Sequence, residues 1–170
     1  DETIKAEFYK KESVKNNYNE LTINFKGNYS IQFRAYDDGV AYRFCTKFSK
    51  PITIVKEGVT YNFDDDYTAY IPYVNPGNFY GDNISKQFFN SFENVYSVTS
   101  ISKIEDDKLA FLPILMSLKD NKKVVITEAN LEDYPGLYLR KNKDEANSLC
   151  GIHANYPKTG EQSGFNMLQS

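Results

Sequence analysis

Tryptophan is absent from this 170-residue chain, histidine occurs once and cysteine twice. One imidazole and two thiols cannot supply the histidine- or cysteine-rich ligand sets of most transition-metal sites. The sequence contains no G-x-x-x-x-G-K-[ST] or G-x-G-x-x-G phosphate loop. No apolar run approaches the roughly 18 residues needed to cross a membrane. The net charge of -3 argues against a nucleic-acid-binding protein, which normally has a high pI.

The chain also lacks an initiator methionine and a charged-then-apolar leader. We therefore expect a processed or excised piece, or a sequence from which the leader was omitted. Its 170 residues suit one domain, since domains average about 100–200 residues. The alternating segment 165–169 stops at Ser170, which suggests that the parent protein continues.

Aromatic residues are plentiful, with 14 Tyr and 12 Phe, and such side chains favour strands. Residues 20–46 alternate apolar and polar positions, the period-two pattern of half-buried strands. Turn residues interrupt this pattern at Gly27-Asn28 and at Asp37-Asp38-Gly39. The segment predicts a three-stranded antiparallel meander.

Further short strands are predicted along the rest of the chain, while residues 1–18 suggest a frayed entry or an edge strand. The predicted strands cover 52–55, 61–63, 68–73, 96–104, 109–118, 123–127, 137–140 and 149–154. Residues 109–118 are nearly all apolar, which favours a strand buried on both faces. Residues 75–91, rich in Gly, Pro and Asn, form the longest irregular stretch. This spacing of strands predicts an all-β sandwich.

The single histidine and the two cysteines offer little catalytic chemistry. Cys150 and His153 are three positions apart, which on a strand directs them to opposite faces. A structural role for His153 is therefore favoured. Cys45 and Cys150 form either one disulfide or two separate buried thiols, and the second alternative is favoured.

Several charged residues are candidates for a functional site, but a structural role explains each of them. Asp64-Asp65-Asp66 lacks the spacing of a calcium loop and reads as a solvated turn. Arg34 and Arg43 lie on adjacent predicted strands, where pairing with acidic neighbours is expected.

Glu128 ends a predicted strand and precedes a loop shaped by Pro135 and Gly136. A carboxylate in such a place can act as a metal ligand or as an acid or base. The residues alone favour a capping or salt-bridging role.

Six blocks in order resemble the N-terminal domain of glycoside hydrolase family 97, which comprises secreted bacterial α-glucosidases and α-galactosidases. The blocks are Tyr18–Leu21, Phe33–Phe44 (FRAYDDGVAYRF), Asp66–Asn75 (DYTAYIPYVN), Leu109–Leu118 (LAFLPILMSL), Val124–Leu139 (VVITEANLEDYPGLYL) and Tyr156–Gln169 (YPKTGEQSGFNMLQ).

This resemblance implies an antiparallel β-super-sandwich of the galactose-mutarotase type, truncated at its C-terminal end. Residues 1–170 would be one partial N-terminal domain. The catalytic (β/α)₈ barrel and a small C-terminal domain would lie outside the chain, so no activity is expected of the fragment by itself.

The resemblance also implies a calcium ion shared with the barrel, to which Glu128 in Thr127-Glu128-Ala129 contributes one ligand. The implied partners are the barrel of the same parent chain and an α-linked oligosaccharide. The implied location is the periplasm or the exterior of a bacterium, with the leader removed.

A rival interpretation is an independent carbohydrate-binding or scaffold module. The Tyr- and Asn-rich segment 75–96 offers Tyr80 and Tyr96 for stacking on sugar rings. Titration of the isolated chain with malto-oligosaccharides or galactosides discriminates between the two, because a binding module predicts micromolar affinity.

Overall fold

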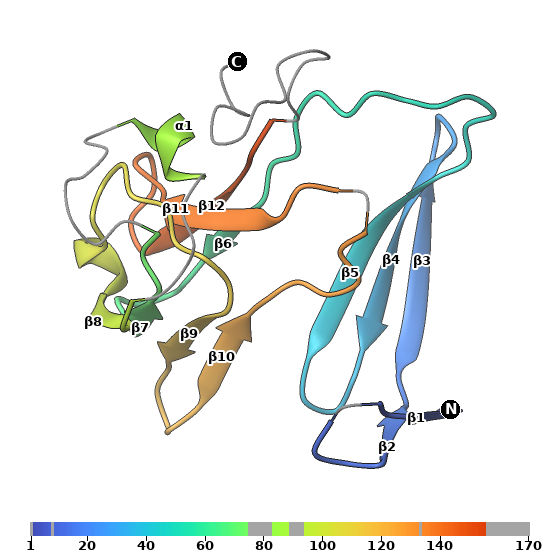
Figure 1. Ribbon diagram of the computed structural model, residues 1–170, viewed down its shortest axis with the longest axis horizontal. Helices are drawn as coiled ribbons and strands as arrows, with labels where there is room; N and C mark the ends of the chain where they lie inside the picture. Colours follow the sequence, from blue (N-terminus) through green and yellow to red (C-terminus); the bar gives the residue numbers. More distant parts are fainter. Residues whose placement is uncertain (1, 8, 75–82, 89–93, 133, 156–170) are drawn as a thin grey trace. The chain divides into compact units, whose positions relative to one another are not determined.

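The computed structural model describes residues 2–7, 9–74, 83–88, 94–132 and 134–155, and the chain divides into two compact units, Asp1–Ile54 and Val55–Ser170. Both units are built from antiparallel strands (Figure 1). Helical structure among the described residues amounts to one short α-helix and one 3₁₀ turn. The predicted all-β class is confirmed, whereas the assignment of 1–170 to a single domain stays a prediction.

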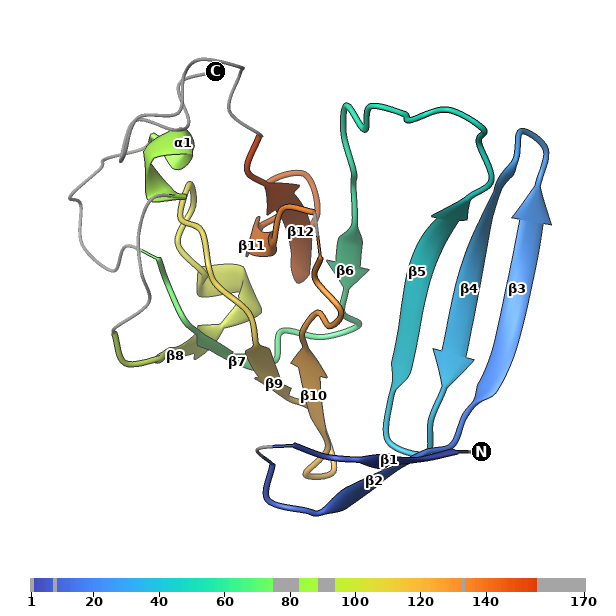
Figure 2. The same ribbon diagram turned by 45° about the vertical axis from the view of Figure 1, so that its right-hand side comes forward.

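The first unit contains the meander predicted for residues 20–46. Its strands are β3 (Asn19–Phe25), β4 (Tyr29–Ala35) and β5 (Val40–Thr46), paired in the order β3-β4-β5 (Figure 2). The first turn closes because Gly27 and Asn28 adopt positive φ values of 104° and 63°. Glycine enters this region without steric cost, and asparagine enters it more readily than most residues. The meander prediction is confirmed.

One face of the meander is apolar. The strand register sets its members in cross-strand rows; they are Leu21, Ile23, Phe25, Tyr29, Ile31, Phe33, Tyr42 and Phe44. Several stay exposed, including Leu21 at 59% and Phe44 at 54%. Among the described residues of this unit, Ser30 alone is buried. The alternation therefore sorts side chains between two faces without creating a buried apolar core in this unit.

The polar N-terminal segment forms a two-stranded hairpin. β1 (Glu2–Lys5) pairs with β2 (Ser13–Asn16), and the Asn16 side chain donates to the Glu2 carboxylate at 2.6 Å. The segment is thus extended, as the edge-strand alternative predicted.

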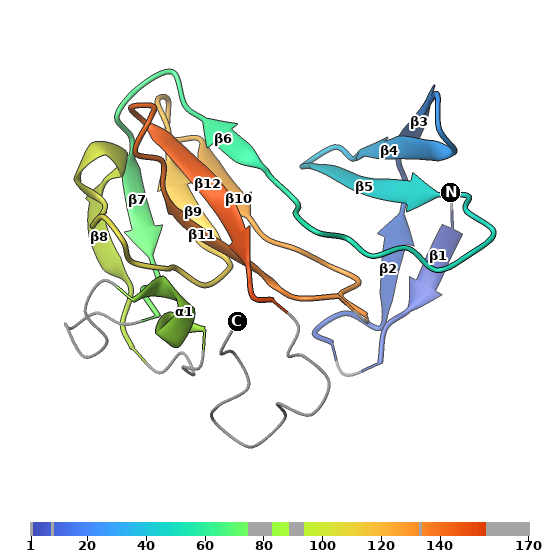
Figure 3. The same cartoon turned by 90° about the horizontal axis from the view of Figure 1, so that it is seen from above.

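The second unit holds two antiparallel sheets. The first has the order β10-β9-β7-β8, with β7 (Thr68–Ile71), β8 (Ser97–Ser100), β9 (Ile114–Ser117) and β10 (Lys123–Ile126). The second has the order β11-β12-β6, with β6 (Thr60–Asn62), β11 (Leu137–Lys141) and β12 (Ser148–His153). Figure 3 shows the two sheets next to each other within the unit.

The two sheets share one core, which makes this unit a sandwich. The buried side chains from the first sheet are Ala69, Ile71, Ile114, Met116 and Ile126, and those from the second are Leu139 and Leu149. Ala110 joins the sheets further, because it forms bridges to both Tyr73 and Leu139. Apolar side chains of both sheets therefore leave water together, which supplies the main stabilising term for this unit.

The apolar run 109–118 forms a shorter strand than predicted. Strand structure covers Ile114–Ser117, preceded by a cis peptide bond at Leu112-Pro113 and by the bridge at Ala110. Ile114 and Met116 are buried, whereas Leu115 and Ser117 are half-buried, so burial alternates along the strand. The prediction of a long strand buried on both faces is wrong, because proline has no N–H for a ladder.

Two other predicted strands differ from the structure. Residues 52–55 form no strand, and the segment 96–104 is a strand only over β8 before a 3₁₀ turn, η1 (Ile101–Lys103). The strands predicted at 61–63, 68–73, 123–127, 137–140 and 149–154 are present as β6, β7, β10, β11 and β12, with shifted ends.

A short helix, α1 (Ile84–Gln87), lies inside the stretch predicted to be irregular. Asn83 caps it by accepting a hydrogen bond from the Lys86 N–H. The predicted segment at 165–169 lies outside the described residues. No described helix is long and apolar enough to cross a membrane.

Candidate functional site around Glu128

Glu128 lies just beyond the end of β10, where the chain leaves the core. Ile126, the last residue of β10, is buried, while Thr127 and Glu128 are exposed. The buried strand end therefore fixes the backbone from which the carboxylate projects to the surface.

The Glu128 carboxylate turns back onto the start of β11. The Leu137 N–H donates to both of its oxygens, at 3.0 Å to Oε1 and 3.1 Å to Oε2. This contact ties the two ends of the segment between β10 and β11 together. Charge-assisted hydrogen bonds of this kind are stronger than neutral ones.

Gly136 leaves the space in which the Glu128 carboxylate lies. A Cβ atom built on Gly136 would be 3.3 Å from Glu128 Oε1 and 3.6 Å from Leu131 Cδ2. Both Leu137 and Gly136 were missed as site residues in the sequence analysis. The Pro135-Gly136 pair after Glu128 was the available signal, but it does not reveal which backbone N–H meets the carboxylate.

Near the start of β11, the Tyr134 side chain contacts two others, those of Glu57 and His153. Tyr134 donates to Glu57 Oε2 at 2.6 Å, and its ring meets the edge of the His153 ring at 5.9 Å between centroids. His153 ends β12 and is paired in register with Leu137. The register and the ring contact therefore place the lone histidine close to the start of β11, which the Glu128 carboxylate also contacts. His153 Nδ1 is buried there without a hydrogen-bond partner.

Tyr138 is the second residue of β11 and lies in an aromatic group. Its ring centroid is 5.0 Å from that of Phe88 and 5.3 Å from that of Phe111. Burial raises the pKa of Tyr138, and the negative charge of Glu128 raises it further. Tyr138 therefore stays protonated, and its hydroxyl neutral, at neutral pH.

The donor chemistry of Glu128 fits calcium as one ligand of several. Its carboxylate is exposed and engages a single N–H, so it retains lone pairs for a cation. Calcium takes about six to eight oxygen ligands. Over the part of the chain that the structure describes, no group of three or more His, Cys, Asp or Glu residues is placed to hold a metal. Further ligands would have to come from elsewhere.

The glycosyl-hydrolase 97 N-terminal family model matches residues 1–163. The chain belongs to this family. The family assignment confirms the resemblance carried by the six sequence blocks. This glycosyl-hydrolase 97 N-terminal chain is also 46% identical, over 169 residues, to a retaining alpha-galactosidase of Bacteroides thetaiotaomicron. The match covers 99% of the chain and 25% of that relative, so the chain spans about a quarter of the relative's length.

Each carboxylate of the acidic run Asp64-Asp65-Asp66 contacts a different partner. Asp65 forms an ion pair with Lys119 at 2.8 Å, and the hydrogen bond from Lys119 lowers the pKa of Asp65. Asp66 accepts from the hydroxyl and the backbone N–H of Ser102, and these bonds lower the pKa of Asp66. Asp64 accepts from the Tyr67 hydroxyl at 2.7 Å. The run is a turn with local partners, as its spacing predicted.

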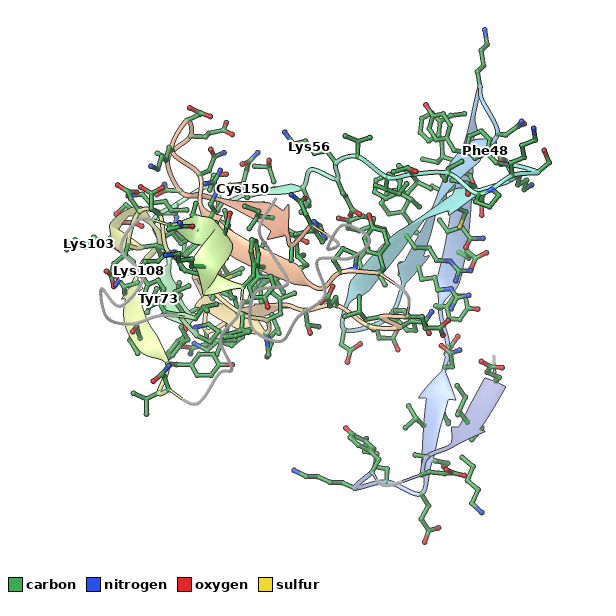
Figure 4. All side chains as sticks on the ribbon, turned by 45° about the horizontal axis from the view of Figure 1, so that its top comes forward. Phe48, Lys56, Tyr73, Lys103, Lys108 and Cys150 are labelled. Carbon is green, nitrogen blue, oxygen red and sulfur yellow. The ribbon has the colours of Figure 1, made fainter. Side chains whose placement is uncertain are left out.

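The two cysteines are both free and half-buried. Cys45 is on β5 and Cys150 on β12, where Figure 4 labels it. Neither thiol is fully buried, so the predicted burial is not met. The two cysteines belong to different units, so the choice between separate thiols and a disulfide stays a prediction.

The predicted pairing of the arginines is confirmed for one of them. Arg34 forms a cross-strand ion pair with Glu20 at 2.9 Å and lies 4.1 Å from the Tyr18 ring centroid. Arg43 instead donates to the Gln32 side chain at 2.7 Å. Both contacts belong to the polar face of the meander.

Of the two tyrosines offered for sugar stacking, Tyr80 lies outside the described residues. The Tyr96 hydroxyl donates to the Pro113 carbonyl at 3.2 Å, with the residue 39% exposed. This contact ties Tyr96 to the segment before β9.

Proposed function

We propose that this chain is the accessory N-terminal part of a calcium-dependent α-glycosidase. It packs on the catalytic barrel of the same parent protein and contributes Glu128 to a shared calcium ion. The observation that carries the proposal is the exposed Glu128 carboxylate, held at 3.0 and 3.1 Å from the Leu137 nitrogen in a member of this family.

The proposed substrate of the whole protein is an α-galactoside, hydrolysed with retention of configuration. The support is the 46% identity to a retaining alpha-galactosidase across nearly the whole chain. The chemistry of bond cleavage would belong to the barrel, because the described part of this chain offers no assembled set of catalytic groups. Export to the periplasm or the exterior is part of the same proposal.

The role of this chain's own residues is to present and orient one anionic oxygen ligand. The end of β10 fixes the backbone, and the Leu137 N–H fixes the carboxylate. When bound, calcium would supply a positive charge that orients substrate oxygens. A ligand that arrives from outside the barrel would also couple docking of this domain to metal binding.

The proposal predicts that Glu128→Gln in the full-length parent enzyme weakens calcium binding by about a hundredfold and lowers activity. Loss of a ligand should cost at least as much as the roughly 10–100-fold that loss of a supporting contact costs. Calorimetric titration with calcium, alongside hydrolysis of an aryl α-galactoside over a calcium series, measures both effects. Glu132→Gln is the matched control, an exposed glutamate of the same segment. An unchanged calcium affinity in Glu128→Gln would remove the ligand role.

A further inference from the structure

The contact between Glu128 and Leu137 limits how the carboxylate can meet a cation. The Leu137 nitrogen is nearly equidistant from the two oxygens, at 3.0 and 3.1 Å. It therefore lies in front of the carboxylate near its midline. A cation bound by both oxygens would occupy this same position.

Gly136 leaves room for the Glu128 carboxylate because it has no side chain. A Cβ at 3.3 Å from Glu128 Oε1 would press the carboxylate by a few tenths of an ångström. The φ of Gly136 is outside the left-handed region, so alanine can adopt this backbone. Any effect of a side chain here is consequently steric and falls on Glu128 and Leu131.

From this geometry we propose that the Leu137 N–H and the side-chain-free space at Gly136 position Glu128 so that it binds calcium through one oxygen only. Leu137 and Gly136 are positioning residues, and Glu128 is the ligand. Calcium accepts both one-oxygen and two-oxygen carboxylates, so the N–H decides between two modes that the ion itself permits. This inference rests on the proposed function, because it requires Glu128 to be a calcium ligand.

The choice has a consequence for the ion. A carboxylate that gives one oxygen leaves a further coordination position for water, a substrate hydroxyl or another protein ligand. A hydrogen-bonded carboxylate is also already ordered, so less side-chain freedom is lost when the ion binds. Outer contacts of this kind typically change metal affinity by about 10–100-fold.

The test separates charge from position in the full-length parent enzyme. Glu128→Gln removes the charge but keeps an oxygen that can accept from Leu137. Gly136→Ala and Gly136→Val keep the charge but crowd the carboxylate in two steps. Gly58→Ala is the matched control, because a Cβ there has nothing within 4 Å. Calcium affinity is measured by calorimetry, and protection of the Leu137 amide by hydrogen–deuterium exchange with and without calcium.

We expect Glu128→Gln to lose calcium affinity while the Leu137 amide stays protected. We expect Gly136→Ala to lose a few-fold in affinity and Gly136→Val about tenfold, both with faster exchange at Leu137, and Gly58→Ala to match the parent. In the unsubstituted enzyme, the Leu137 amide should stay protected when calcium is bound.

Three outcomes would overturn parts of this account in distinguishable ways. Calcium affinity unchanged in Glu128→Gln would reject the proposed ligand role itself. Affinity lost in Glu128→Gln but unchanged in Gly136→Val would reject positioning by Gly136. Loss of Leu137 protection on adding calcium to the unsubstituted enzyme would show that the carboxylate leaves the N–H and binds through both oxygens. This last measurement needs no variant, so it decides the point even if Gly136→Val fails to fold.

Discussion

The side chain of Gln87 shows how one residue can anchor an irregular part of the chain. It is fully buried, and its Nε2 donates to the Asp107 carbonyl at 2.7 Å while its Oε1 accepts from the Leu109 N–H at 2.8 Å. Buried polar groups are tolerated when they are hydrogen-bonded. The amide therefore links α1 to the segment before β9 through two hydrogen bonds.

Substitution of Gln87 by alanine should destabilise the chain by about 2–4 kcal/mol. The physical reason is that the buried Leu109 N–H and the half-buried Asp107 carbonyl would lose their partners, each at a cost of about 1–3 kcal/mol. Urea denaturation of both proteins measures the change. Lys86→Ala on the same helix is exposed and should change the free energy of unfolding little. A loss below about 0.5 kcal/mol in Gln87→Ala would contradict the anchoring role.

The contacts of single side chains were the hardest features to predict from the sequence. The position of Glu128 just after a strand was predictable, since the short apolar run Val124–Thr127 marks the end of β10. Its partner was not predictable, because the Leu137 N–H lies nine positions away and meets the carboxylate only after the segment folds back. Gln87 was missed for the same reason, as a polar residue in an irregular stretch gives no sign of burial.

At the scale of elements, backbone approach between β6 and β12 depends on a residue without a side chain. Gly151 in β12 donates its N–H to the Val59 carbonyl at 2.9 Å. A Cβ at this position would lie 2.8 Å from Leu137 Cδ1 and would also strike Val59 Cγ1. The side chains on both sides of β12 thus occupy the volume that an alanine methyl needs.

Gly151→Ala should therefore destabilise the chain by about 1–3 kcal/mol, the usual cost of overpacking. We expect a lower midpoint of thermal unfolding, and faster amide exchange in the residues that pair β6 with β12. Gly58→Ala, which meets no atom within 4 Å, is the control. An unchanged midpoint in Gly151→Ala would mean that Val59 and Leu137 move aside freely.

Elements themselves were predicted well where a local pattern is complete. The meander from 19 to 46 has alternation in every strand and turn residues between them. The run 109–118 was overextended, because hydrophobicity alone does not show that Pro113 interrupts the ladder. Residues 52–55 are apolar and β-branched but find no partner strand among the described residues.

On the scale of the whole molecule, the buried apolar side chains are unevenly distributed. Every buried hydrophobic residue among those described belongs to the unit Val55–Ser170. The unit Asp1–Ile54 keeps its apolar meander face largely exposed. Since burial of apolar surface is the main favourable term in folding, the two units should differ in local stability.

Hydrogen exchange on the 170-residue chain should therefore show slower exchange in β7, β9 and β12 than in β3 and β5. Local opening is easier where few apolar contacts are buried, and we expect the difference to be about tenfold or more. β3 and β5 are edge strands, and so is β8 in the other unit. Comparing exchange in β8 with exchange in β3 and β5 therefore separates the effect of an edge position from the effect of the unit. Equal protection in the meander and in the sandwich strands would contradict this prediction.

The sequence by itself determined the β class, most strands, the turn at Gly27-Asn28, and the family. These properties depend on alternation, backbone preference and blocks of neighbouring residues, all of which act over a few positions. Only the tertiary structure decided that two sheets share one core, that Gln87 is buried, and that the Leu137 N–H holds Glu128. Those contacts join residues nine or more positions apart in the chain, and they form only when folding brings the donor and the acceptor to the same place.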